Sequence, residues 1–234
     1  MKLMTRKLNS REWLVGLSAI YVVVAVMMNI FCMKALSFGS PVIICDAGLL
    51  ISWGVFLISN VIVEVWDFRT SMVLVTFAAV VSFLVMLLGL LIVHIPTLPE
   101  YEDQAQAFAK IFSNGPRTII ASVIAFWTGN YINSHIIYNL RIRLEKANRD
   151  NRLFFFARAS FSTLIGQLAD NAIFMVLAFA PIGLSLYEMN MYDIMTAVLS
   201  GTVIELVVET CFVPFITIPL TRKIREVRKA EASV

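Results

Sequence analysis

Six long apolar segments dominate this chain of 234 residues and limit what it can fold into. We place them at Trp13–Met33, Leu49–Trp66, Met72–His94, Thr118–Leu140, Ala157–Pro181 and Ile194–Leu220. A helix rises about 1.5 Å per residue, so about 20 apolar residues cross a hydrocarbon core about 30 Å thick. Because 59% of the residues are hydrophobic and only 15% are charged, we predict an all-α polytopic membrane protein. Its six transmembrane helices would form a single integral membrane domain over residues 1–234.

The basic residues predict how the chain is oriented in the membrane. All but three of the 19 Lys and Arg residues lie in the two terminal tails or in the connections after the second and fourth segments. The exceptions are Lys34, Lys110 and Arg117. Cytoplasmic loops carry an excess of Lys and Arg, so both termini are expected in the cytoplasm. Three segments followed by three would then have opposite orientations, as in the 3+3 inverted repeats of secondary transporters.

Four carboxylates lie within the apolar segments: Glu64, Asp170, Glu205 and Glu209. An ionisable side chain at the bilayer centre costs about 2.5–3.5 kcal/mol or more, so it usually faces the bundle interior and marks a transport path. No basic residue has the same predicted depth, because Arg158 lies at a segment end and is expected to extend to the interface. The acids are therefore candidate functional residues, although Glu205 could instead be a protonated core acid.

Helical spacing places further polar and aromatic side chains on the same faces as the acids, because residues three or four apart share one helix surface. The candidates are Trp53, Phe56, Asn60, Trp127, Asn130, Asn133, Gln167, Asn171 and Phe174. Hydrogen-bonding groups mixed with aromatic rings are typical of a site for a polar organic ligand. The amides could instead be interhelical hydrogen-bonding groups, worth about 0.6 kcal/mol each.

The sequence contains no motif of a known enzyme class. It has no His-Glu-x-x-His, no phosphate-binding glycine loop and no Gly-x-Ser-x-Gly. Its two histidines lie on different segments, and its three cysteines lack metal or disulfide spacing. We therefore expect no enzymatic activity, no cofactor and no metal. The basic connection after the fourth segment is the normal charge of a cytoplasmic loop, so we expect no nucleic-acid partner.

Three stretches give the chain a specific resemblance: SNVIVEVWDFRTS (59–71), GPRTIIASVIAFWTGNYINSHII (115–137) and STLIGQLADNAIF (162–174). Over essentially all six segments the chain resembles the queuosine precursor transporter family, integral membrane proteins of the vitamin uptake transporter type. The family pattern has an acid closing span two, an arginine opening span four, a Gln-x-x-Asp pair in span five and a glutamate five residues before a proline in span six. The matching residues are Glu64, Arg117, Gln167, Asp170 and Glu209.

The resemblance implies uptake of a 7-deazaguanine base, such as 7-cyano- or 7-aminomethyl-7-deazaguanine or queuine, across a bacterial inner membrane. The chain departs from the family pattern at Asn60, where members often have Asp, and at Glu205, where they tend to have Lys. A carboxylate can accept the adjacent N–H donors of such a base, an amide can donate to its carbonyl and an aromatic ring can stack on it. The expected partners are this nucleobase-like molecule and the lipid bilayer, with a homodimer left open.

Two other functions stay open. The chain could transport or capture another small solute or vitamin, or it could be a membrane scaffold that transports nothing. A transporter needs its polar faces to converge on one water-accessible cavity, whereas a scaffold would scatter them among helix pairs. For a transporter, we expect one central cavity lined by Glu64, Asp170 and Glu209 together with Asn130, Asn133 and Gln167.

Overall fold

A computed structural model describes residues 8–32, 34–36, 45–112, 115–147, 151–181 and 188–233 of the chain. The helices are α1 (Ser10–Phe31), α2 (Leu49–Val65), α3 (Phe68–Val93), η2 (Pro99–Tyr101), α4 (Glu102–Phe112), α5 (Gly115–Lys146), α6 (Arg152–Phe179), α7 (Met191–Phe212), η3 (Val213–Thr217) and α8 (Ile218–Ala232). The strands β1 (Ala35–Leu36) and β2 (Cys45–Asp46) form one short antiparallel pair, with Ala35 opposite Asp46. The predicted helical architecture is confirmed, with this two-residue pair as an addition.

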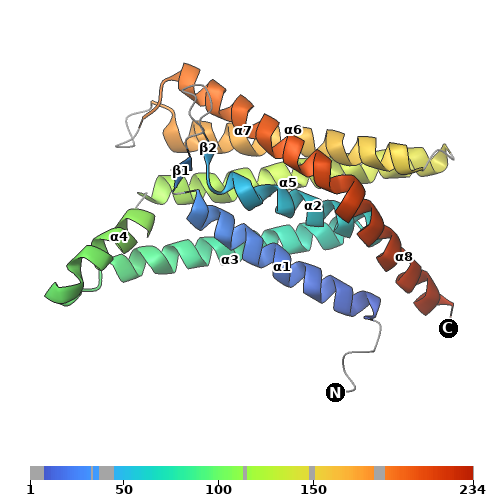
Figure 1. The fold of residues 1–234 in the computed structure, drawn as a ribbon, viewed down its shortest axis with the longest axis horizontal. Coiled ribbons are helices and arrows are strands. Elements are labelled where there is room, and N and C mark those ends of the chain that lie inside the picture. Colours follow the sequence, from blue (N-terminus) through green and yellow to red (C-terminus); the bar gives the residue numbers. More distant parts are fainter. Residues whose placement is uncertain are drawn as a thin grey trace.

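The long helices run back and forth between two ends of a bundle (Figure 1). One end, here called the terminal end, holds the start of α1, the end of α8 and the turn between α2 and α3 (Figure 1). The other end, called the loop end, holds β1, β2 and α4 (Figure 1). Helix α5 packs against α6, α3 and α2, whereas α1 packs against α2 and α3. The start of α1 and the end of α8 lie at the same end, as expected for an even number of crossings.

Four helical stretches are long and apolar enough to cross a membrane: Ser10–Phe31, Phe68–Val93, Arg152–Phe179 and Met191–Ala232. Leu49–Val65 is apolar but shorter. Helix α5 has 32 residues but carries several amides and hydroxyls along its length. Because α5 has other helices on several sides, its polar groups can face protein instead of lipid. The structure therefore supports a multi-pass membrane protein, and four of the six predicted segments meet this criterion.

Polar caps explain where the long helices begin. The side chain of Asp67 accepts a hydrogen bond from the Thr70 N–H and so caps the start of α3. The helix begins at Phe68, four residues before the predicted start at Met72. Asn151 and Asn190 cap α6 and α7 in the same way. These side chains satisfy backbone N–H groups that have no partner within the helix. The apolar pattern alone therefore placed the start of α3 too late.

Two glycines let α5 and α6 approach each other closely. A Cβ atom at Gly129 would lie 2.8 Å from the Gly166 carbonyl oxygen and 2.7 Å from the Asp170 Cβ. A Cβ atom at Gly166 would lie 2.7 Å from the Asn133 Cβ. Small residues permit such approach in membrane bundles. The crossing therefore fixes the separation of the polar residues that α5 and α6 carry.

Candidate functional site

The acids of the apolar segments occupy three levels between the loop end and the terminal end. Asp170 and Glu205 line a cavity near the loop end. Glu209 follows Glu205 by one helical turn of α7 and is fully buried among neutral side chains. Glu64 lies at the end of α2 among arginines. We expected Glu64, Asp170 and Glu209 to line one central cavity, but in the structure they lie at three different levels.

The loop-end cavity has two adjoining parts that share Asn29, Cys32, Ser122 and Phe174. The part that contains the acids has an empty volume of about 460 Å³, including space open to the surroundings. Its lining residues are Met28, Asn29, Cys32, Gly48, Leu49, Ser52, Ser122, Asp170, Asn171, Phe174 and Glu205. No Lys or Arg lines either part in the described ranges of the chain. The part that contains the acids is therefore acidic, and polar side chains from five helices line it.

The two acids of the cavity differ in their hydrogen bonding. Glu205 is 4% exposed, accepts a hydrogen bond from the Ser52 hydroxyl and accepts a second from Asn171 Nδ2 at 2.9 Å. Asn171 also donates to the Thr202 hydroxyl at 3.1 Å. In contrast, no described residue donates a hydrogen bond to the half-buried Asp170 carboxylate. Asp170 therefore has unused acceptor capacity toward a ligand.

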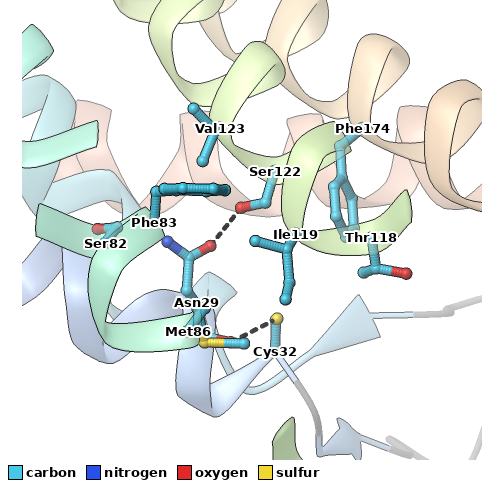
Figure 2. A pocket seen from close by; sticks show the side chains of 10 residues that line it. All are labelled: Asn29, Cys32, Ser82, Phe83, Met86, Thr118, Ile119, Ser122, Val123 and Phe174. Carbon is cyan, nitrogen blue, oxygen red and sulfur yellow. Dashed lines mark hydrogen bonds between the residues drawn. The ribbon is translucent and has the colours of Figure 1, made fainter. Parts of the chain in front are cut away.

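The residues that the two parts share contribute an amide and an aromatic wall (Figure 2). The Ser122 hydroxyl of α5 donates to the Asn29 side-chain oxygen of α1, as the dashed line in Figure 2 shows. Asn29 Nδ2 donates one of its two N–H groups to the Ala25 carbonyl at 3.1 Å, so one N–H group remains as a donor. The ring of Phe174 stands on the α6 side of the same space (Figure 2). The cavity thus offers acceptors, amide donors and a stacking surface to one ligand.

Between the loop-end cavity and the terminal end lies a group of buried, hydrogen-bonded side chains from α2, α5, α6 and α7, which we call the central network. Glu209 accepts hydrogen bonds from Thr163 at 2.7 Å, Asn60 at 3.2 Å and Gln167 at 3.4 Å. Asn133 Nδ2 donates to Asn60 Oδ1 at 2.9 Å. The oxygens Asn133 Oδ1 and Gln167 Oε1 are buried without a partner in the described structure. Such acceptors can bind the N–H groups of a ligand that moves inward.

The terminal end is closed by an arginine cluster around the last residues of α2. Arg158 Nε lies 2.7 Å from Glu64 Oε1, with side-chain exposures of 1% and 0%. Arg225 Nη2 lies 2.7 Å from Glu64 Oε2. Arg141 donates to the Glu64 carbonyl at 2.9 Å and Arg228 donates to the Val65 carbonyl. Positive groups are favourable where helix carbonyls lack partners.

The expectation that Arg158 extends to the interface is wrong. Its guanidinium is buried because Glu64, which lies across the bundle on α2, accepts hydrogen bonds from both its Nε and Nη2 atoms, at 2.7 and 2.9 Å. The sequence shows these two residues 94 positions apart, so only the packing of α2 on α6 brings them together. Both Glu64 oxygens are thereby occupied by arginines, and Glu64 lines neither part of the loop-end cavity.

The remaining candidates have structural partners elsewhere. Asn130 accepts a hydrogen bond from the Tyr21 hydroxyl at 3.0 Å. Arg117 donates to the carbonyls of Leu177 and Ala180 and so caps the end of α6. Three aromatic candidates lie outside the loop-end cavity: Trp53 stacks on Phe212, Phe56 is buried against Gly166, and Trp127 is exposed and bonded to Thr76.

The sequence-based candidates lacked several cavity residues, among them the polar residues Asn29 and Ser52. Ser52 precedes Phe56 and Asn60 at a spacing of four, so the α2 face already contained it. Asn29 is an amide near the end of an otherwise apolar segment, and that isolation was the available signal. Their role depends on contacts between helices, of Asn29 with Ser122 of α5 and of Ser52 with Glu205 of α7, which single-helix periodicity does not reveal.

In the described ranges, no group of three or more His, Cys, Asp and Glu residues could hold a metal ion. The protein family described as "Putative vitamin uptake transporter" matches residues 46–218, well over half of the chain. This range covers α2 through α7 and therefore contains all four acids. No curated protein and no solved structure matches the chain.

Proposed function

Because the chain belongs to the vitamin uptake transporter family, we propose that it takes up a small polar solute through the loop-end cavity. The observation that carries this proposal is the presence of Asp170 and Glu205 in one cavity with amides, hydroxyls and an aromatic ring. A scaffold would not need a carboxylate without a hydrogen-bonding partner at that depth, because burying it costs free energy.

The proposed arrangement in the membrane follows from the charges at the two ends. Helices α1, α2, α3, α5, α6 and α7 would cross a bacterial inner membrane as one domain, with the terminal end in the cytoplasm. The arginine cluster supports this orientation because basic residues are retained on the cytoplasmic side. The loop-end cavity would then face outward, and the central network and arginine cluster would close the path inward.

The proposed substrate is a 7-deazaguanine base. Its pairing edge presents adjacent N–H donors from which Asp170 can accept together, while the Asn29 amide can donate to its carbonyl and Phe174 can stack on its ring. Two acids without a Lys or Arg in the cavity lining favour a base with a cationic substituent, such as an aminomethyl group. The proposed function of Glu205 is to bind that cation.

Uptake in cells that lack their own deazaguanine transporter tests this proposal. Cells expressing the chain would be given radiolabelled 7-aminomethyl-7-deazaguanine or, in parallel, a panel of radiolabelled vitamins. Unlabelled 7-aminomethyl-7-deazaguanine, 7-cyano-7-deazaguanine and queuine would serve as competitors. We expect accumulation above vector control, competition by the deazaguanines and the strongest competition by the aminomethyl compound.

The outcomes separate the functions that the sequence left open. Accumulation of a labelled vitamin in place of the deazaguanine would reassign the substrate and leave the transport function in place. If no panel compound accumulates although the protein is inserted and folded, the scaffold reading replaces the transporter.

A further inference from the structure

A second cavity lies at the terminal end and shares Arg225 with the arginine cluster around Glu64. It is lined by Asn151, Arg152, Phe155, Ile218, Thr221, Arg222 and Arg225, and its empty volume is about 370 Å³ including open space. Three of these residues are arginines, and no acid is among them. We propose that this cavity binds a phosphate group.

Two of the arginines have no neutralising partner among the residues that the structure describes. Neither the Arg152 nor the Arg222 guanidinium makes an ion pair or hydrogen bond with any residue that the structure describes, and both are exposed. Arg225 reaches the same cavity while its other atoms hold Glu64. The N–H groups of one guanidinium form a planar fork that can donate to two phosphate oxygens at once. Arginine side chains therefore suit a phosphate ligand.

The start of α6 adds a second source of positive potential. Asn151 caps the helix by accepting from the Phe154 N–H at 3.0 Å. The earlier N–H groups of a helix have no partner within it, and the helix dipole places partial positive charge there. Since α6 has 28 residues, its N-terminus is suited to an anion.

An independent observation comes from Thr221 of α8. This residue is 1% exposed, lines the cavity, and its hydroxyl is buried without a hydrogen-bond partner in the described structure. A buried hydroxyl that is left unpaired costs free energy, and an anion in the cavity would accept its hydrogen. The ligand would therefore be held by α6 and α8 together, beside the arginine that binds Glu64.

The phosphate could come from a soluble phosphate compound or from the headgroup of an anionic lipid at the membrane surface. Thermal unfolding of the full chain in neutral detergent distinguishes these sources. One arm adds inorganic phosphate against chloride at equal ionic strength, and the other adds phosphatidylglycerol against diacylglycerol in the micelle. We expect at least one phosphate-bearing probe to raise the unfolding temperature relative to its matched control.

Variants show whether the stabilisation arises in this cavity. Arg152→Gln and Arg222→Gln should abolish the rise. Thr221→Val should reduce it, because it removes the hydroxyl while preserving volume and charge. Lys229→Gln removes an equal charge from the exposed surface of α8 outside the cavity and should preserve it. A response to neither probe, or an equal loss in Lys229→Gln, would overturn the proposal, since the effect would then be absent or due to diffuse charge.

Discussion

At the scale of single residues, what distinguishes the four acids is the set of groups that each carboxylate faces. Glu64 faces two arginines, Glu209 faces three neutral donors and Glu205 faces a hydroxyl and an amide. Asp170 faces the cavity without such a partner. Only the last environment leaves a carboxylate ready for a ligand, so Asp170 is the residue most directly tied to substrate binding.

Asp170→Asn should reduce uptake of the substrate by about 10- to 100-fold, because a hydrogen bond to a charged group contributes about 1.5–3 kcal/mol. The substitution preserves volume, so insertion and folding should be unchanged. Initial uptake rates and detergent-solubilised yield would be measured beside Asp103→Asn, an exposed site on α4. Normal uptake by Asp170→Asn would remove Asp170 from the binding site.

Arg158→Ala should destabilise the protein by about 3–5 kcal/mol, because it leaves Glu64 buried with one partner fewer. Arg225→Ala should cost less, since the Arg225 side chain is 31% exposed and Arg158 would still hold Glu64. The unfolding temperatures of the two variants in detergent show which substitution destabilises the protein more. Adding Glu64→Gln to Arg158→Ala should restore part of the loss, and the absence of any restoration would argue against this ion pair as the cause.

At the scale of secondary-structure elements, the crossing of α5 over α6 determines where the polar faces meet. The Gly129 and Gly166 backbones lie so close that neither position has room for a methyl group. The neighbours of these glycines are Asn133 of the central network and Asp170 of the cavity. A change at the crossing should therefore affect stability and the binding geometry together.

Gly166→Ala should destabilise the bundle by about 1–3 kcal/mol, the usual cost of overpacking, and should also lower uptake. Gly16→Ala is the matched control, because nothing lies within 4 Å of a Cβ atom there and alanine favours helix. Unfolding temperature and uptake would be measured for both variants. If Gly166→Ala and Gly16→Ala had the same unfolding temperature and the same uptake, the α5–α6 contact would be able to accommodate a methyl group without loss of stability or transport.

At the scale of the whole molecule, the charge distribution and the position of the termini predict one orientation. Gln104 of α4 lies at the loop end and Ala230 of α8 at the terminal end, and both are exposed. In a background without Cys32, Cys45 and Cys211, Gln104→Cys should react with an impermeant thiol reagent added to intact cells. Ala230→Cys should react only after the membrane is opened. The reverse pattern would invert the proposed topology.

The sequence by itself determined the helical membrane architecture, because hydrocarbon permits few backbone arrangements and long apolar runs are readable without tertiary contacts. It also identified the four acids, whose polarity contrasts with their segments, and it placed Asp170, Asn171, Phe174 and Glu205 among the candidates that the cavity brings together. It did not determine which acids share a space. The pairing of Glu64 with Arg158, the separation of Glu209 from Asp170 and the contribution of Asn29 all depend on which helices pack side by side. Helical periodicity specifies the face of one helix, but only the tertiary structure specifies what that face meets.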